Sequence, residues 1–210
     1  MTTVTAGAPR TKAERGAATR VRLLDATVDC LVELGWAGTS TTEVVRRAGV
    51  SRGAQVHHYP TKEDLVLAAI EHLLQRRLDE YHAAFDRLPA AKRTPTQAVE
   101  LLWESCFGRT FEAWLELAVA SRHDDVLRRR FREVEARFWT SNVERFAGMF
   151  PEVAADPQFA AVALRFAFSV LDGLAIGRLI GVSEDDLSQV RIAFTTVVQP
   201  FFPISQGGTG

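Results

Sequence analysis

The sequence has little cysteine and lacks the segments that are typical of secreted or membrane proteins. Two cysteines, Cys30 and Cys106, are too few for a disulfide framework or a zinc ribbon in 210 residues, which indicates a reducing cytosol. The first sixteen residues contain no apolar core of the kind that a signal peptide needs. The richest apolar stretch, 166–182, is interrupted by Asp172 and Arg178 and is too short to span a bilayer. We therefore expect a cytoplasmic protein without a membrane partner.

Motifs of the common enzyme classes are also missing. The chain has no Gly-rich phosphate loop, no His-Glu-x-x-His, no Gly-x-Ser-x-Gly and no Cys-x-x-Cys. His123, Asp124 and Cys106 are reactive residue types, but their spacing does not bring them together with an activating partner. The pair His57-His58 has no carboxylate or cysteine at metal-ligand spacing. The sequence therefore predicts no enzymatic activity, no cofactor and no metal site.

Neither sign of charge dominates the whole chain, but the two signs are unevenly placed. Lys and Arg number 25 against 26 Asp and Glu, so no global positive field attracts nucleic acid. Residues 1–60 carry eight basic and five acidic side chains, whereas residues 61–210 carry 17 basic and 21 acidic ones. This asymmetry indicates a basic head on an acidic body, so any contact with nucleic acid must be local.

Helix start and stop signals recur along the chain, while alternating strand patterns and Asn-Gly hairpin signals do not occur. With 47% apolar residues, the composition is that of a globular protein. We predict an all-α fold of about nine helices. The expected spans are a first helix that ends at Gly35, followed by helices over 41–49, 52–59, 62–88, 95–107, 110–121, 124–150, 157–181 and 184–202.

Two short predicted helices are joined by Gly49-Val50-Ser51 in the basic head. A glycine supplies the positive φ that such a tight reversal needs, and Val50 can fill the angle between the helices. This pattern is typical of a helix-turn-helix, which places its second helix in the major groove of DNA. The spacing alone is equally compatible with a helical corner inside an ordinary bundle.

The residues around this turn resemble a known family. The stretch from Arg20 to Leu34, Gly35-Trp36, Thr39 to Ser51 and the segment SRGAQVHHYPTKEDL over 51–65 resemble the N-terminal domain of the tetracycline-repressor (TetR/AcrR) family of bacterial transcriptional regulators. The resemblance covers about residues 18–70, and the remaining body matches in length and helix count. Residues 1–16 are predicted to be a disordered N-terminal arm, as is common at chain termini. The resemblance implies a helix-turn-helix DNA-binding domain over 17–63 and an effector-binding and dimerisation domain over 64–204.

The resemblance also implies which side chains meet DNA. Arg52 is the expected base reader, because a guanidinium can bond both O6 and N7 of guanine. Gln55 stands where the family usually has Leu, so it either reaches an adenine edge or packs inward, and Val56 replaces a Tyr that would bond phosphate. Hydroxyls at a helix N-terminus favour phosphate. The predicted DNA contacts are Ser40, Thr41, Thr42, Ser51, Arg52, Gly53, Ala54, Gln55, His57, His58 and Lys62.

The body is rich in aromatic residues, which are typical either of a helical core or of an apolar pocket. The family resemblance implies a pocket between the middle helices for a small hydrophobic effector. The candidate ligand-binding residues are Trp103, Phe107, Trp114, Leu117, Phe138 and Asn142.

Three glycines, Gly173, Gly177 and Gly181, recur at intervals of four within an apolar helix. Each costs about 1 kcal/mol of helix stability, so a close contact must compensate. The contact is either packing within one subunit or, as the resemblance implies, a homodimer interface through helices around Phe159–Gly181 and Ser183–Phe202.

Together these features predict a homodimeric regulator, a repressor that binds a palindromic double-stranded DNA operator and is released by a largely apolar ligand. The competing hypothesis is a helical ligand-binding protein or an enzyme with a vestigial helix-turn-helix.

Overall fold

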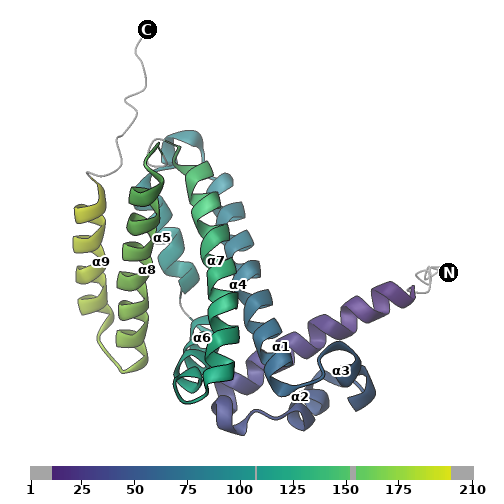
Figure 1. Cartoon of the computed structure of the whole chain (residues 1–210). Coiled ribbons are helices and arrows are strands. Elements are labelled where there is room, and N and C mark those ends of the chain that lie inside the picture. The colour runs from purple at the N-terminus through teal and green to yellow at the C-terminus, as the bar shows by residue number, and fades with distance from the viewer. Residues whose placement is uncertain (1–10, 107, 152–154, 200–210) are drawn as a thin grey trace, which may run out of the picture. The chain divides into compact units, whose positions relative to one another are not determined.

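The computed structural model describes residues 11–106, 108–151 and 155–199, and Figure 1 shows helices throughout these ranges. Within them lie nine α-helices, two short 3₁₀ segments and no strand, so the predicted all-α fold is confirmed. The elements are α1 (Lys12–Gly38), α2 (Thr41–Ala48), α3 (Arg52–His58), α4 (Lys62–Asp86), η1 (Ala90–Lys92), α5 (Pro95–Cys106), α6 (Arg109–Ala120), η2 (Ser121–His123), α7 (Asp125–Met149), α8 (Pro157–Leu179) and α9 (Glu184–Val198).

Local capping residues explain where most of these helices begin. The hydroxyls of Ser40, Ser51 and Ser183 each accept a hydrogen bond from a backbone N–H of the first turn of the following helix. At the start of α8, the Asp156 carboxylate accepts bonds from the backbone N–H groups of Gln158 and Phe159, both at 3.0 Å. Because each cap acts within three residues, the sequence predicted these helix starts closely.

The chain divides into two compact units, which we describe separately. The first comprises Met1–His72 and Glu112–Arg128 and therefore contains α1, α2, α3, the first turns of α4 and most of α6. Its interior is made of aliphatic side chains that are almost completely shielded from solvent, among them Leu23, Leu31, Val44, Leu65, Val66, Ile70, Leu117 and Leu127.

Helix α1 begins earlier than the sequence predicted. Lys12 is already helical, because Thr11 and Glu14 form a capping box: the Glu14 N–H donates to the Thr11 hydroxyl at 3.2 Å, and the Thr11 N–H donates to the Glu14 carboxylate at 2.7 Å. Residues 12–16, which the sequence assigned to a disordered arm, are thus part of α1. The remainder of that predicted arm, residues 1–10, lies outside the described residues.

The second unit comprises Leu73–Phe111 and Arg129–Gly210. In it α5 packs against both α8 and α9, and Figure 1 shows α8 and α9 side by side. One core cluster contains Trp103, Leu171, Leu174 and Leu187, and a second contains Val99, Phe194 and Val198. These contacts fix α8 and α9 against α5 through one face of each helix.

Helix α8 corrects one sequence argument. It has 23 residues with a mean hydropathy of 1.8 over its most apolar window, so by length and composition alone it is long enough to cross a membrane. Core helices of soluble proteins meet the same criterion, and α8 packs on α5 and α9. Part of its apolar surface nevertheless remains exposed, since Val162 is 61% and Phe166 is 48% exposed.

Candidate nucleic-acid interface

A tight turn joins α2 to α3. Gly49 has φ 61° and ψ 40°, the left-handed conformation that glycine adopts without a steric penalty. Around it the Gly49 N–H donates to the Arg46 carbonyl at 3.4 Å, and the Val50 N–H donates to the Val45 carbonyl at 3.3 Å. Ser51 then starts α3 by accepting from the Ala54 N–H at 3.1 Å. These contacts create the helix-turn-helix that the sequence predicted.

The N-terminus of α2 is exposed in part. The Ser40 hydroxyl accepts from the Glu43 N–H at 3.2 Å, so it already satisfies one N–H of the helix. Thr41 is half-buried, whereas Ser40 and Thr42 are exposed. The positive end of the α2 dipole therefore remains accessible to an anion.

Arginines on α2 are neutralised by neighbouring carboxylates. Glu43 lies 2.6 Å from the Arg46 guanidinium and 2.7 Å from that of Arg47, and Arg47 also lies 2.6 Å from Glu33. The hydrogen bonds from Arg46, and next those from Arg47, lower the pKa of Glu43 to about 2. The two arginines of α2 and these two carboxylates therefore balance one another, and the excess positive charge of residues 1–60 lies on the other basic side chains.

The residues of α3 point in different directions. Arg52, Gly53 and His57 are exposed, and no partner for the Arg52 guanidinium is found among the described residues. Ala54 is half-buried. Gln55 is only 1% exposed. An exposed guanidinium at the start of α3 has the position that a base reader needs.

Gln55 corrects the set of predicted DNA contacts. Its side-chain amide donates a hydrogen bond to the Tyr59 carbonyl, which holds the side chain inside the unit. The inward alternative left open by the sequence therefore applies, and in this structure Gln55 is not available to a base edge.

His58 and Lys62 are partly enclosed. Burial, and next the charges of His57 and Arg20, lower the pKa of His58. The Lys62 ammonium donates to the Trp36 carbonyl at 2.6 Å and lies 4.0 Å from the centroid of the Trp36 ring. Lys62, predicted as a phosphate contact, thus already has two partners inside the protein.

The residues predicted to line the effector pocket lie mainly in the packed interior. Trp103 is buried against Leu171, Leu174 and Leu187, and the buried Asn142 amide donates to the Phe138 carbonyl at 2.8 Å. Leu117 is fully buried in the first unit, Trp114 is half-buried there, and Phe107 lies outside the described residues. The five described candidates do not line the apolar cavity found in the second unit.

That apolar cavity has a volume of about 330 Å³. Its one side-chain hydroxyl, that of Tyr81, already donates to the Ala98 carbonyl at 3.3 Å. The lining residues are Tyr81, Ala98, Val99, Leu102, Phe146, Phe150, Phe159, Val162, Ala163, Leu164, Phe166, Ala167, Phe194, Val197 and Val198. Sequence reasoning missed this site because its lining residues come from five helices that are far apart in the sequence. The one feature that could have indicated it is the group of small residues that leave room between the large ones.

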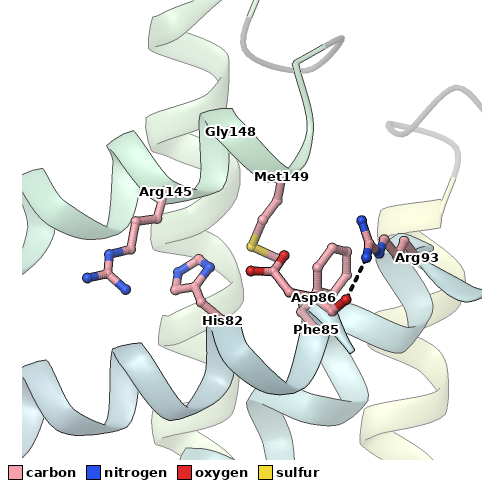
Figure 2. A pocket seen from close by; sticks show the side chains of 7 residues that line it. All are labelled: His82, Phe85, Asp86, Arg93, Arg145, Gly148 and Met149. Atoms are coloured by element: carbon pink, nitrogen blue, oxygen red, sulfur yellow. Dashed lines mark hydrogen bonds between the residues drawn. The ribbon is translucent and has the colours of Figure 1, made fainter. Parts of the chain in front are cut away.

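A second cavity of about 370 Å³ is polar (Figure 2). In Figure 2 the His82 imidazole lies between α4 and α7, with Arg145 and Met149 of α7 on the opposite side. The buried His82 Nε2 has no hydrogen-bond partner among the described residues. Burial, followed by the charge of Arg145, lowers the pKa of His82. Arg145 pairs with Asp79 at 2.5 Å, and Arg93 bonds the backbone carbonyl of Asp86 at 2.5 Å. Within the described ranges, no three His, Cys, Asp or Glu side chains are grouped to hold a metal ion.

Known proteins share both this sequence pattern and this fold. Residues 23–69 match the model for bacterial regulatory proteins of the tetR family. The HTH-type transcriptional regulator CymR of Pseudomonas putida is 30% identical over 182 residues, which cover 87% of this chain and 90% of CymR. The chain belongs to the TetR family.

Two further comparisons extend the similarity over most of the chain. An uncharacterized HTH-type transcriptional regulator of Mycobacterium tuberculosis is 29% identical over 190 residues, covering 90% of this chain and 96% of that protein. The crystal structure of a TetR-family regulator from Rhodococcus sp. has a TM-score of 0.69 at 18% identity and covers 89% of this chain and 100% of that one, which shows a shared fold.

Membership of the TetR family settles the class of activity. The relatives are transcriptional regulators rather than enzymes, so this chain is a DNA-binding regulator of transcription. TetR-family regulators are soluble cytoplasmic proteins.

Proposed function

We propose that this TetR-family regulator is a repressor that binds a palindromic operator as a homodimer and is released by a small, largely apolar ligand. The main support for this proposal is the helix-turn-helix, because Arg52 is exposed at the start of α3 and has no partner among the residues that the structure describes. We further propose that residues 17–63 act as the DNA-binding domain and residues 64–204 as the effector-binding and dimerisation domain.

The proposed DNA contacts fall into two groups. Ser40, Thr41 and Thr42 approach phosphate at the N-terminus of α2, and His57 and His58 do so at the end of α3. Base recognition is assigned to the start of α3. The residues proposed for it are Ser51, Arg52, Gly53 and Ala54.

The apolar cavity supports the chemical class of the effector. Apart from the hydroxyl of Tyr81, which is already bonded to Ala98, its named lining side chains are hydrocarbon or aromatic. A charged ligand would lose its hydration there without gaining a partner, whereas an apolar ligand gains about 25 cal/mol for each Å² that it buries. Tyr81 belongs to α4, the helix that begins beside the helix-turn-helix, so a bound ligand contacts a helix that reaches the DNA-binding unit.

The proposed dimer face lies on α8 and α9. Val162, Ile180 and Ile192 are 61%, 76% and 62% exposed, which is unusual for apolar side chains grouped on two neighbouring helices. Exposed residues that recur every three or four positions lie on one face of α8. They are Val162, Phe166, Ser169, Gly173 and Ile176, and Ile180 follows directly after the helix. Arg165, Arg178 and Leu179 of α8 are also exposed, outside this row.

Selection of bound sequences from a random DNA pool, followed by ligand titration, tests the proposal. We expect an inverted repeat to be enriched, and apolar compounds to lower operator affinity in fluorescence anisotropy. Ala163→Trp should fill the cavity, abolish this response and leave operator affinity unchanged, because Ala163 lines the cavity. Absence of any enriched sequence, or release only by strongly charged compounds, would refute the proposal.

A further inference from the structure

Trp36, near the end of α1, is held by two other helices. Its backbone N–H donates to the Glu116 carboxylate of α6 at 3.1 Å. Its carbonyl accepts from the Lys62 ammonium of α4 at 2.6 Å, and the same ammonium lies 4.0 Å from the centroid of its ring. All three residues belong to the first unit, so one residue joins α1, α4 and α6.

The backbone at Gly35 makes this contact possible. Gly35 has φ 67° and ψ 179°, so it interrupts α1 immediately before Trp36. A Cβ on Gly35 would lie 3.1 Å from the Glu116 carboxylate, closer than most real contacts allow. Glycine therefore both permits the positive φ and leaves room for the Glu116 side chain. The Thr39 hydroxyl, which donates to the Gly35 carbonyl at 2.7 Å, stabilises the break.

The environment of Lys62 is that of an internal contact. Its ammonium is partly enclosed, and this burial lowers its pKa despite the opposing charge of Glu63. The Trp36 carbonyl and the negative face of the indole ring compensate for the lost hydration. Withdrawing the ammonium to reach a phosphate would leave the Trp36 carbonyl without this donor.

We propose that Trp36, Lys62 and Glu116 form a clamp that fixes α1 and the start of α2 against α4 and α6, and that Lys62 acts in this clamp instead of binding a DNA phosphate. The clamp sets the presentation of the helix-turn-helix because α2 begins five residues after Trp36. The effect of the clamp on the helix-turn-helix rests on the proposed DNA binding, whereas the clamp itself is a property of the DNA-free protein.

The first test is the salt dependence of operator binding. A phosphate contact contributes about 0.9 to the slope of log affinity against log salt. We expect Lys62→Met to weaken binding about tenfold at every salt concentration and to leave this slope unchanged, since only the presentation of α3 is altered. Lys92→Met, which removes an exposed lysine of η1, controls for the loss of one charge. A slope that becomes shallower by about one unit in Lys62→Met alone would overturn the assignment.

The second test needs no DNA. We expect amide hydrogen exchange at Trp36, followed by NMR, to be about tenfold faster in Glu116→Ala and in Lys62→Met than in the wild type. Glu116→Gln keeps an acceptor oxygen and should retain most of the protection, while Glu112→Ala on the same helix should have no effect. Unchanged exchange in Glu116→Ala would disprove the clamp whether or not an operator exists, whereas failure to find an operator would disprove only the proposed function.

Discussion

At the scale of single residues, the partners of an arginine decide what it can do. Arg46 and Arg47 are bound to Glu43, so their charges are compensated within the head. Arg52 lies a few residues further on, exposed and at the start of α3. Arg52 is therefore better placed to bind a base edge than either arginine of α2. A base edge would replace only water at Arg52, whereas at Arg46 or Arg47 it would have to displace a carboxylate.

We accordingly expect Arg52→Ala to relax sequence preference at one operator position in each half-site, at a cost of about 1–3 kcal/mol of discrimination. Arg46→Ala is the matched control, because it removes a paired arginine from the same head and should preserve the preference. Binding of each variant to a library of single-base operator variants measures both effects. Equal loss of preference in the two variants would contradict the assigned role of Arg52.

Sequence reasoning succeeded at residues whose partners are close along the chain. The left-handed Gly49 and the Ser40 and Ser51 caps depend on neighbours within three or four residues, and they were predictable. The inward position of Gln55 had to remain an open alternative, because two orientations of the side chain fitted the pattern equally. Lys62 could not be placed, because its partner Trp36 lies 26 residues earlier.

At the scale of helices, the sequence predicted where each helix lies along the chain but not which of its faces packs within the subunit. The three α8 glycines were predicted to form one contact surface, yet the structure separates them. A Cβ on Gly177 would lie 3.2 Å from Leu187, so Gly177 packs within the subunit, the alternative that the sequence left open. Gly173 is exposed with open space around it, and Gly181 has φ 88° beyond the end of α8.

A half-buried carboxyl on α8 gives a prediction for the dependence of stability on pH. Burial, and next the charge of Glu135, raises the pKa of Asp172 to about 6, from 3.8. The folded state therefore holds its proton more tightly than the unfolded state, so Asp172 stabilises the fold at low pH and loses this contribution as pH rises to about 6 and above.

Asp172→Asn should therefore raise the free energy of unfolding above about pH 7 by on the order of 1–3 kcal/mol, and the gain should vanish below about pH 4. Urea unfolding across this range measures it. His82→Gln is the contrasting variant. Because the pKa of His82 is lowered in the folded state, His82 reduces the free energy of unfolding as pH falls below about 6.5, so this variant should gain stability at low pH and not at high pH. A gain in Asp172→Asn that does not depend on pH would show that desolvation of the carboxylate is not its cause.

At the scale of the whole molecule, one chain leaves a large apolar surface without cover. The exposed side chains of α8 continue on α9 through Val190, Ile192 and Val197, of which Ile192 is 62% exposed. Carboxylates are confined to the first turn of α9, among residues 184–186. An exposed apolar surface of this kind is more stable against a second copy of the chain than against water. Its apolar side chains also contribute to the high mean hydropathy by which α8 resembles a membrane segment in composition.

We expect Ile192→Asp and Gly173→Leu to produce monomers at micromolar concentration in sedimentation equilibrium. The first places a charge in the proposed interface, and the second adds bulk at a position that has open space in the single chain, so both monomers should keep the wild-type helix content. Val119→Asp is the matched control, since Val119 is an exposed apolar residue of α6, outside α8 and α9, and this variant should remain dimeric.

Gly177→Leu should have a different effect and destabilise the subunit by about 1–3 kcal/mol, because the new side chain would clash with Leu187. Because a palindromic operator is bound by two recognition helices together, the two monomeric variants should also lose operator affinity while retaining weak binding to a single half-site. Dimers of unchanged mass in both variants would place the interface elsewhere.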